Sequence, residues 1–325
     1  MIQPSLDELV LPLARHAVDR DYLARSRENL FDELWENEKT RVLAMHNGAV
    51  LLNLDHEMVG PKLQLMKVEE VPSAQLRVYL GKTLDATDTE PIDTPVVLAI
   101  LSDNAASAIE ADTTRWHNLR KSGLGLSDRD SGLFTQALAL ANWHETHVYC
   151  PRCGTPTLVA QGGWVRRCFK DDSEVFPRTD PAIIVSVIDR EDRILLGSQG
   201  TWEQNRWSVL AGFVEPGESL NHAVLREMFE EAGVRLESPQ YLGSQAWPFP
   251  YSLMLGFTAR LRADSPVQQP DGIEIEKLRW FTRAELAAEA PKMLLPNRIS
   301  IARAMIERWF GSDLVSATES GNSSK

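Results

Sequence analysis

One stretch of the chain, Gly212 to Val234, constrains the fold more than any other. It contains a Pro-Gly turn, then Ser219, a favoured helix N-cap, and later Gly233, which suits the left-handed position just past a helix end. Between these signals apolar residues recur every four positions, as expected for a helix with one buried face: Leu220, Val224, Met228 and Ala232. The stretch therefore predicts the end of a strand, a turn and a short helix packed on a core.

A second face of this predicted helix is acidic. Glu227, Glu230 and Glu231 are spaced i, i+3 and i+4, so their carboxylates crowd together and repel one another unless a cation lies between them. Carboxylate oxygens suit hard divalent ions such as Mg²⁺ and Mn²⁺. The alternative is an acidic face that is simply solvated, which is the usual meaning of a run of like charges.

The residues around the three glutamates follow a longer pattern, which favours the metal-binding interpretation. The pattern is G-x5-E-x7-R-E-U-x-E-E-x-G-U, with U an apolar residue, and every fixed position is met from Gly212 through Glu218 and Arg226 to Val234. It resembles the Nudix box, the signature of hydrolases that cleave a nucleoside diphosphate linked to another group. The resemblance implies a catalytic Nudix domain at residues 179–312, built as an α/β/α sandwich with a mixed sheet.

The composition limits the remaining possibilities. A chain of 325 residues is long enough for two or three domains, and the fold class we expect is α+β. The net charge of −12 argues against broad attraction to nucleic acids or anionic membranes, and no apolar run is long enough to span a bilayer. The N-terminal residues are charged throughout, so no signal peptide is expected, and the three cysteines fit a reducing cytoplasm.

Residues 1–126 predict a mixed, mostly β domain. Asn47-Gly48 is a strong hairpin signal between two short apolar runs. Nothing in this domain suggests chemistry, so its role is left open. The runs that predict strands are 42–45, 49–52, 75–80 and 96–101.

Residues 127–178 predict a connecting helix, capped by Ser127, and a zinc-ribbon-like motif. Cys150 and Cys153 form a C-x-x-C knuckle, and Cys168 begins a second one, but Asp171 stands where the fourth cysteine is expected. Zinc accepts carboxylate oxygen, so a structural Cys3Asp site is chemically possible.

Two alternatives to the Cys3Asp site remain open. His144 or His147 could supply a nitrogen to the metal, although both precede the first knuckle. The ribbon could also keep its shape without metal, its cysteines acting as small buried apolar residues.

The remaining patterns place strands, two helices and a tail in the last part of the chain. Thr282 and Glu285 form a capping box that opens a short helix, and residues 298–311 have the spacing of an amphipathic helix. The polar residues 313–325 predict a disordered tail. Strands are expected at 182–188, 194–197, 207–214, 240–246, 252–260 and 277–281.

A second motif narrows the resemblance within the Nudix superfamily. The run Ser244-Gln-Ala-Trp-Pro-Phe-Pro-Tyr-Ser252 is similar to the S-Q-P-W-P-F-P-x-S signature of NADH pyrophosphatases, with Ala246 in place of one proline. The resemblance implies hydrolysis of NADH, and usually NAD⁺, to nicotinamide mononucleotide and AMP. It also implies removal of NAD caps from RNA 5′ ends, and a homodimer with its site close to the subunit interface.

The resemblance also assigns roles to individual residues. It implies Mg²⁺ or Mn²⁺ held by Glu227, Glu230, Glu231 and a glutamate before the last strand, which is Glu274, with Glu276 as the close competitor. Glu230 is the first choice for general base and Glu231 the second. Arg226 lies one turn before Glu230, where an ion pair would orient the acidic group, and Glu218 is expected to brace the loop. Candidate substrate contacts are Phe213, Phe176, Gln245, Ser300 and Ala302.

Two other functions compete with this prediction. One is a Nudix hydrolase of another nucleoside diphosphate derivative, such as ADP-ribose or a dinucleoside polyphosphate. The other is a Nudix-fold sensor that binds NAD without cleaving it, although such proteins usually lose the carboxylates that this chain retains. A zinc-ribbon nucleic-acid binder is disfavoured, because Arg166, Arg167 and Lys170 form only a small basic patch.

Overall fold

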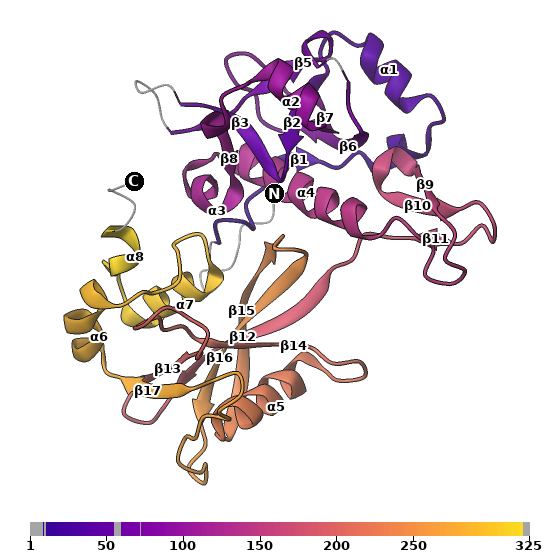
Figure 1. Ribbon diagram of the computed structural model, residues 1–325. Helices are drawn as coiled ribbons and strands as arrows, with labels where there is room; N and C mark the ends of the chain where they lie inside the picture. The colour runs from indigo at the N-terminus through magenta and orange to yellow at the C-terminus, as the bar shows by residue number, and fades with distance from the viewer. Residues whose placement is uncertain (1–8, 10, 55–59, 72, 321–325) are drawn as a thin grey trace. The chain divides into compact units, whose positions relative to one another are not determined.

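The computed structural model describes residues 9, 11–54, 60–71 and 73–320 (Figure 1). The chain divides into two compact units. The N-terminal unit comprises Arg15–Thr179 and Trp247–Tyr251, and the C-terminal unit comprises Met1–Ala14, Asp180–Ala246 and Ser252–Lys325. No described helix is long and apolar enough to cross a membrane.

The N-terminal unit is built on an eight-stranded sheet, as the mostly β prediction requires. Its strand order is β1-β6-β7-β2-β3-β4, with β5 paired to β2 and β8 to β3. The strands are β1 (Val18–Asp19), β2 (Arg41–His46), β3 (Ala49–Asn53), β4 (Lys62–Leu63), β5 (Leu65–Lys67), β6 (Leu76–Thr83), β7 (Pro95–Ile100) and β8 (Trp116–Asn118). The helices are α1 (Leu30–Glu36), α2 (Asp103–Ile109), α3 (Leu119–Ser122) and α4 (Asp128–Thr146), with 3-10 turns η1 (Tyr22–Ser26), η2 (Val68–Glu70), η3 (Thr113–Arg115) and η4 (Gly123–Gly125).

The predicted hairpin at Asn47-Gly48 is confirmed. Both residues have positive φ, 50° and 72°, and Met45 pairs with Val50 across β2 and β3 in antiparallel register. Positive φ at both central positions is the geometry that joins two twisted strands most tightly, and glycine adopts it without steric cost.

The ribbon segment lies in the same compact unit as the eight-stranded sheet. The Ser127 side chain caps α4 by accepting a hydrogen bond from Asp130 N. Gln136 on α4 and Trp164 in the ribbon both donate to backbone carbonyls of β6, at 2.8 and 2.7 Å. The ribbon itself is a three-stranded sheet of β9 (Thr157–Ala160), β10 (Val165–Cys168) and β11 (Glu174–Val175), with the 3-10 turn η5 (Gln161–Gly163).

The C-terminal unit contains a six-stranded sheet of order β15-β16-β12-β13-β17, with β14 paired to β12. β12 and β16 are parallel, whereas β12 pairs antiparallel with β13 and β14, so the sheet is mixed as predicted. The strands are β12 (Asp180–Ile188), β13 (Ile194–Ser198), β14 (Leu210–Phe213), β15 (Leu236–Trp247), β16 (Ser252–Leu261) and β17 (Lys277–Phe281). The helices are α5 (Leu220–Ala232), α6 (Arg283–Glu289), α7 (Ile301–Phe310) and α8 (Ala317–Ser320), with the 3-10 turn η6 (Ala290–Lys292).

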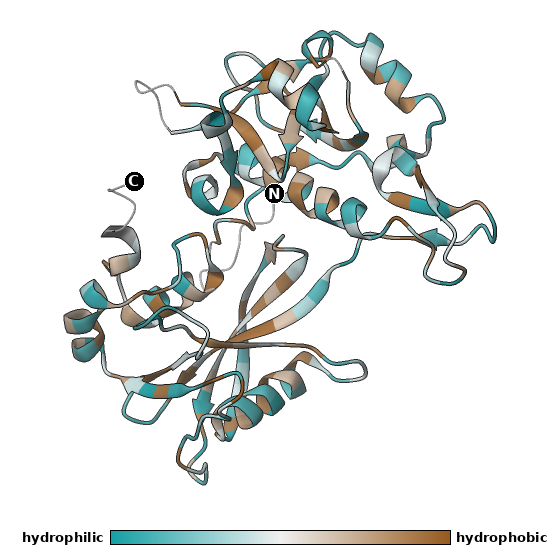
Figure 2. Cartoon of the chain, viewed as in Figure 1, coloured by the Kyte–Doolittle hydropathy of each residue, from teal (hydrophilic) through white to brown (hydrophobic). Residues whose placement is uncertain are grey.

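Side-chain alternation along β12 creates two cores, one on each face of this sheet. Ile183 and its alternate neighbours pack against α5, in a cluster with Val224 and Met228. Ile184 points to the other face, into a cluster with Met305 and other residues of α6 and α7. The predicted α/β/α sandwich is therefore confirmed. Figure 2 shows that the helices of this unit carry both hydrophobic and hydrophilic residues.

The capping signals set the helix ends. Ser219 accepts from His222 N and Gly233 has φ 67°, so α5 lies within the predicted limits. The Thr282–Glu285 capping box is present in α6. The amphipathic helix predicted at 298–311 is shorter, because Ser300 caps it and α7 begins at Ile301.

The structure differs from the predictions at both ends of the chain. Leu11 is buried in the core beside α7, and Leu9 N donates to Leu242 O, so these early residues belong to the C-terminal unit. In the tail, Leu314 is buried, and Thr318 Oγ1 donates to Leu295 O at 2.7 Å. Leu314 and Ser316 are thus buried in a segment predicted to be disordered, and the rest of the predicted tail, 321–325, lies outside the described residues.

Candidate active site and metal sites

The three box glutamates stand on α5 beside the end of β14. Gly212 in β14 makes this closeness possible, because a Cβ there would lie 2.0 Å from the carboxylate carbon of Glu227. A side chain at this position would displace the Glu227 carboxylate from where it lies, which gives the first glycine of the motif a steric reason. β14 is held by antiparallel pairing to β12, including Gly212 with Ile183. The helix and the strand therefore bring the Glu227 carboxylate against bare backbone.

Arg226 connects most of the acidic side chains. Its guanidinium contacts Glu218 through two nitrogens, at 2.7 and 3.1 Å. It also donates to Glu227 at 2.9 Å, to Glu230 at 2.8 Å and to the carbonyl of Phe213 at 3.0 Å. The predicted contact between Arg226 and Glu230 is present, and the same residue ties the helix to the end of β14.

Glu218 braces the loop before α5. Its carboxylate accepts from Glu215 N at 2.8 Å, which is the predicted kind of backbone contact, and from Arg226. These bonds, that from Arg226 foremost, lower the pKa of Glu218 to about 2. Glu218 is therefore ionised at neutral pH and is occupied by contacts within the protein.

Glu231 has the most unfavourable surroundings of the three. It is 5% exposed, and among the described residues its Oε2 atom has no hydrogen-bond partner. Burial, together with the charges of Glu227, Glu274, Asp271 and Glu230, raises its pKa to about 8. A buried carboxylate facing four others is costly unless a cation is present.

Glu227 and Glu230 differ from Glu231 in exposure. Burial raises the pKa of Glu227, and this effect outweighs the opposing bond from Arg226. The side chain of Glu230 is 56% exposed. Glu230 is thus the box glutamate best placed to meet a water molecule or a substrate.

Glu274 and Glu276 have different neighbours. The charge of Glu274 raises the pKa of both Glu227 and Glu231, so Glu274 faces the box helix. Glu276 instead lies beside Gly200, where a Cβ would be 3.4 Å from its Oε2 atom. The geometry therefore favours Glu274 as the member of the acidic group.

The acidic group fits a divalent ion. It offers only carboxylate oxygens, which Mg²⁺ and Mn²⁺ prefer, and one of them, Glu231 Oε2, is buried with no hydrogen-bond partner in the part of the chain that the structure describes. The raised pKa values of Glu227 and Glu231 have the same origin, since an uncompensated negative charge is being buried. A cation at this position would remove the repulsion.

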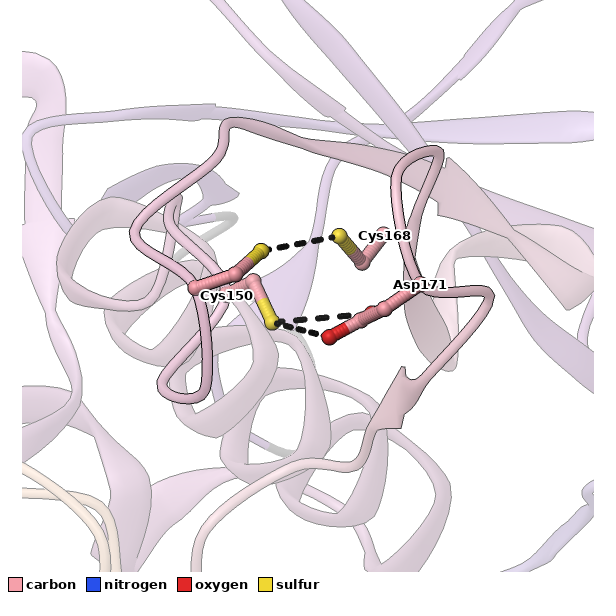
Figure 3. A group of neighbouring side chains, drawn as sticks. Cys150, Cys168 and Asp171 are labelled. Atoms are coloured by element: carbon pink, nitrogen blue, oxygen red, sulfur yellow. Dashed lines mark hydrogen bonds between the residues drawn. The ribbon is translucent and has the colours of Figure 1, made fainter.

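The cysteine motif forms a second candidate metal site (Figure 3). Ligand atoms of Cys150, Cys153, Cys168 and Asp171 all lie within 4.8 Å of one another. Cys150 Sγ is 3.7 Å from Asp171 Oδ2, and Cys153 Sγ is 3.5 Å from Cys168 Sγ. Tetrahedral zinc with bonds of roughly 2.3 Å needs ligand atoms about 3.8 Å apart, so the four side chains fit such an ion. Asp171 therefore occupies the place of the missing fourth cysteine.

The histidine alternatives have other contacts. His144 is buried, with Nε2 2.8 Å from Gly163 O and Nδ1 3.0 Å from the Arg166 guanidinium. His147 Nδ1 lies 2.8 Å from Thr146 Oγ1. Arg166 is itself buried and donates to Thr157, so it does not contribute to a basic surface patch. Among the described residues, the group of potential metal ligands at the knuckle contains Asp171 and no histidine.

Comparison with known proteins places the whole arrangement in one family. Three family models match in succession: an NADH pyrophosphatase-like rudimentary NUDIX domain at residues 39–143, an NADH pyrophosphatase zinc ribbon domain at 145–176, and a NUDIX domain at 177–304. The NAD-capped RNA hydrolase NudC of Mycobacterium tuberculosis is 38% identical over 274 residues, which cover 77% of this chain and 86% of that protein. The chain belongs to the NADH pyrophosphatase family of Nudix hydrolases.

Other relatives of this family member match over shorter spans. The human NAD-capped RNA hydrolase NUDT12 is 36% identical over 201 residues, covering 58% of this chain and 43% of that protein. A crystal structure of a NUDIX hydrolase from Nitrosomonas europaea superposes with a TM-score of 0.41 at 22% identity, covering 51% of this chain and 95% of that one.

The candidate substrate contacts of this Nudix hydrolase fall into different environments. Phe213 is 58% exposed at the end of β14, and Phe176, in the N-terminal unit, is 61% exposed. Gln245 is fully buried and links backbone atoms, accepting from Leu13 N and donating to Ile299 O. Its amide group therefore connects two backbone segments of the C-terminal unit. Contact between Gln245 and the substrate stays a prediction.

Ser300 and Ala302 form the start of α7. Ser300 Oγ accepts from Ala302 N at 3.2 Å, which is the capping bond of the helix, and Ala302 is buried. Sequence reasoning missed Asp271, which lies among the acidic residues around Glu231. An aspartate in a polar loop has no distinctive spacing, and only the turn-forming Asp-Gly pair at 271–272 could have drawn attention to it.

Proposed function

We propose that this protein hydrolyses the pyrophosphate of NADH and NAD⁺ to nicotinamide mononucleotide and AMP, using Mg²⁺ or Mn²⁺, and that it also removes NAD caps from RNA. The observation that carries the proposal is the group of carboxylates on α5 in a chain of the NADH pyrophosphatase family. One of its oxygens, Glu231 Oε2, is buried and has no hydrogen-bond partner among the residues that the structure describes. The names of the curated relatives support cap removal as part of the same activity.

The residues divide the work of the reaction. Glu227, Glu230, Glu231 and Glu274 would hold the divalent ion, which neutralises phosphate oxygens and lowers the pKa of a bound water. Glu230, the exposed member, takes a proton from the attacking water. The water oxygen forms a new bond to phosphorus while the bridging P–O bond breaks, and one nucleotide leaves. Arg226 holds the Glu230 carboxylate in place through their 2.8 Å contact.

Phe213 supplies a surface for the substrate. Its ring is 58% exposed at the end of β14, its backbone carbonyl accepts from Arg226, and an exposed aromatic ring can stack on adenine or nicotinamide. Phe176, exposed in the N-terminal unit, is a second candidate for stacking.

Parallel assays with NADH, NAD⁺, NAD-capped RNA and ADP-ribose test the proposal. We expect AMP and nicotinamide mononucleotide from the first two, and a 5′-monophosphate RNA from the third. Faster hydrolysis of ADP-ribose or of a dinucleoside polyphosphate would favour the other hydrolase activity. Binding of NADH without any product would favour the sensor.

Removing divalent ions should abolish turnover. Metal-ion catalysis contributes several kcal/mol, so EDTA is expected to lower the rate of NADH hydrolysis by at least about 100-fold. Addition of Mg²⁺ or Mn²⁺ to the EDTA-treated protein should restore the rate. Because EDTA also removes zinc, a sample that receives zinc alone serves as the control and should stay inactive. Full activity in EDTA would disprove the metal requirement.

We propose in addition that Cys150, Cys153, Cys168 and Asp171 bind a structural zinc ion. Their ligand atoms lie within 4.8 Å of one another. All four residues lie in the segment 145–176, which matches the zinc ribbon model of the family. Structural zinc is held by four protein ligands, and this group supplies four. The wild type should therefore hold about one zinc per chain, measured by inductively coupled plasma mass spectrometry. Asp171→Ala should lose most of this zinc, whereas Asp171→Cys should keep it.

A neighbouring residue provides the matched control for the zinc test. Asp172 is exposed and contacts Arg167 at 3.6 Å rather than the cysteines. Asp172→Ala should therefore retain zinc. Zinc binding unchanged in Asp171→Ala would show that the aspartate is not a ligand.

The protein is proposed to be a cytoplasmic homodimer. The proposal of a dimer rests on the family resemblance. Light scattering at the assay concentration measures the molar mass, which should be twice that of one chain. The three cysteines form no disulfide with one another and are proposed zinc ligands, which suits a reducing compartment such as the cytoplasm.

A further inference from the structure

The loop that carries Glu274 is fixed on one side by the buried Ile275 side chain and by the bond from Glu276 N to Ser198 O, and on the other by Asp271. The Asp271 carboxylate accepts hydrogen bonds from three backbone N–H groups, those of Ile273 at 3.2 Å, Glu274 at 3.1 Å and Ile275 at 2.8 Å. Oδ1 accepts two of these bonds and Oδ2 accepts the third. Both carboxylate oxygens are therefore committed to the loop backbone.

The backbone of the same residue contacts the metal-binding helix. Asp271 N donates to Glu231 O at 3.2 Å, and Gln269 N donates to Ala232 O at 2.9 Å. These two carbonyls belong to the last turn of α5, where no further N–H of the helix is available to them. Asp271 thus joins Glu231 through its backbone to Glu274 through its side chain.

We propose that Asp271 is a positioning residue, which holds the Glu274 loop against the end of α5 so that Glu274 and Glu231 are ready to bind the same divalent ion. The inference rests on the proposed metal-dependent function and concerns the same site. Glu274 is exposed on a loop, and a ligand on a loose loop must be ordered at the moment when the ion binds. The three bonds to Asp271 provide this ordering in advance.

The geometry argues against a direct role for Asp271 as a metal ligand. Its two oxygens already accept the three loop N–H groups, whereas Glu231 Oε2 has no partner among the described residues. Two substitutions separate the roles. Asp271→Ala removes all three bonds, whereas Asp271→Asn keeps an oxygen that can accept the two bonds made by Oδ1 but loses the negative charge.

The test measures Mn²⁺ affinity by calorimetry or electron paramagnetic resonance, on zinc-loaded protein, in wild-type and Glu274→Gln backgrounds. Loss of an outer contact to a metal ligand typically weakens binding by about 10–100-fold, so Asp271→Ala should raise the Mn²⁺ Kd by about 10-fold or more. In the Glu274→Gln background the same substitution should change the Kd by less than about 2-fold, because the residue through which Asp271 acts is already removed. Asp271→Asn keeps the two bonds to Oδ1 but loses the bond from Glu274 N to Oδ2, so it should recover part of the affinity.

Several results would overturn the inference. Equal losses from Asp271→Ala in both backgrounds, or a loss in Asp271→Asn as large as in Asp271→Ala, would show that Asp271 does not act through Glu274. If Glu274→Gln alone abolishes Mn²⁺ binding, the comparison of Asp271→Asn with Asp271→Ala in the wild-type background decides. If Asp271→Ala fails to fold, Asp271→Asn is compared in the wild-type and Glu274→Gln backgrounds, and an equal loss in both would overturn the inference. Asp264→Ala is the matched control, since Asp264 lies in the same connection and pairs only with Arg262 in the contacts described, and it should bind Mn²⁺ as the wild type does.

Failure of this inference and failure of the proposed function have different signatures. A wild-type protein that binds no Mn²⁺ would contradict the function itself. A wild-type protein that binds Mn²⁺, with Asp271→Ala binding it equally well, would contradict only the role of Asp271.

Discussion

Replacing Glu230 with glutamine is expected to lower kcat for NADH by about 10²–10⁴-fold, the range that general base catalysis contributes. Glu230 is the exposed glutamate of the box, and its 2.8 Å contact with Arg226 holds it at the helix surface. Glutamine keeps the size of the side chain and an oxygen that can accept from Arg226, but it cannot take up a proton at neutral pH. The measurement is AMP release under saturating NADH and Mn²⁺.

The fold should survive this substitution, because the side chain is largely exposed and its neighbours stay satisfied. Circular dichroism and the unfolding temperature should match those of the wild type. Glu237→Gln, an exposed residue on β15, is the matched control and should keep full activity. AMP release near the wild-type rate from Glu230→Gln would remove Glu230 from the mechanism and leave Glu231 as the candidate base.

The second large effect concerns stability. In protein freed of Mg²⁺ and Mn²⁺, the free energy of unfolding should fall as pH rises from about 4.5 to about 8, because the pKa of Glu231 is raised from 4.5 to about 8 by burial and by neighbouring carboxylates. The folded state then binds the proton more tightly than the unfolded state, so the protonated form favours folding. This contribution is fully present below the unfolded pKa and is lost as pH rises through the folded pKa.

The size of this effect follows from the size of the pKa shift. Each pKa unit corresponds to about 1.4 kcal/mol, so the loss is on the order of 4 kcal/mol across the interval. Glu231→Gln, which resembles the protonated carboxyl, should flatten the profile and make the metal-free protein more stable at pH 8. Urea unfolding at a series of pH values measures both curves, with Glu237→Gln as the control that keeps the wild-type slope. Parallel curves for Glu231→Gln and the wild type would contradict the assignment.

Much of the fold was predictable because its signals are local. Ser219 and Gly233 mark the ends of α5 by their own hydrogen-bonding and backbone preferences, and Asn47-Gly48 marks a hairpin in the same way. The α/β/α sandwich was implied by the resemblance to the Nudix box, and the two cores on the faces of the β12 sheet confirm it. The box glutamates were identified because their spacing on one helix fixes their mutual distance.

The features that sequence reasoning missed depend on contacts between distant segments. Asp271 was not singled out, because its place beside α5 depends on a backbone bond to Glu231 in a distant segment of the chain. Arg166 looked like part of a surface patch, but it is buried against Thr157, nine residues earlier in the chain. The tail looked disordered by composition, yet Leu314 finds a place in the core beside α7.

The most direct test of the account is the identity of the products formed from NADH in the presence of Mn²⁺. The proposed function predicts AMP and reduced nicotinamide mononucleotide in equal amounts, detected by liquid chromatography with mass spectrometry, and no product when EDTA replaces Mn²⁺. Release of free nicotinamide with ADP-ribose, or retention of intact NADH by a metal-loaded and folded protein, would contradict it.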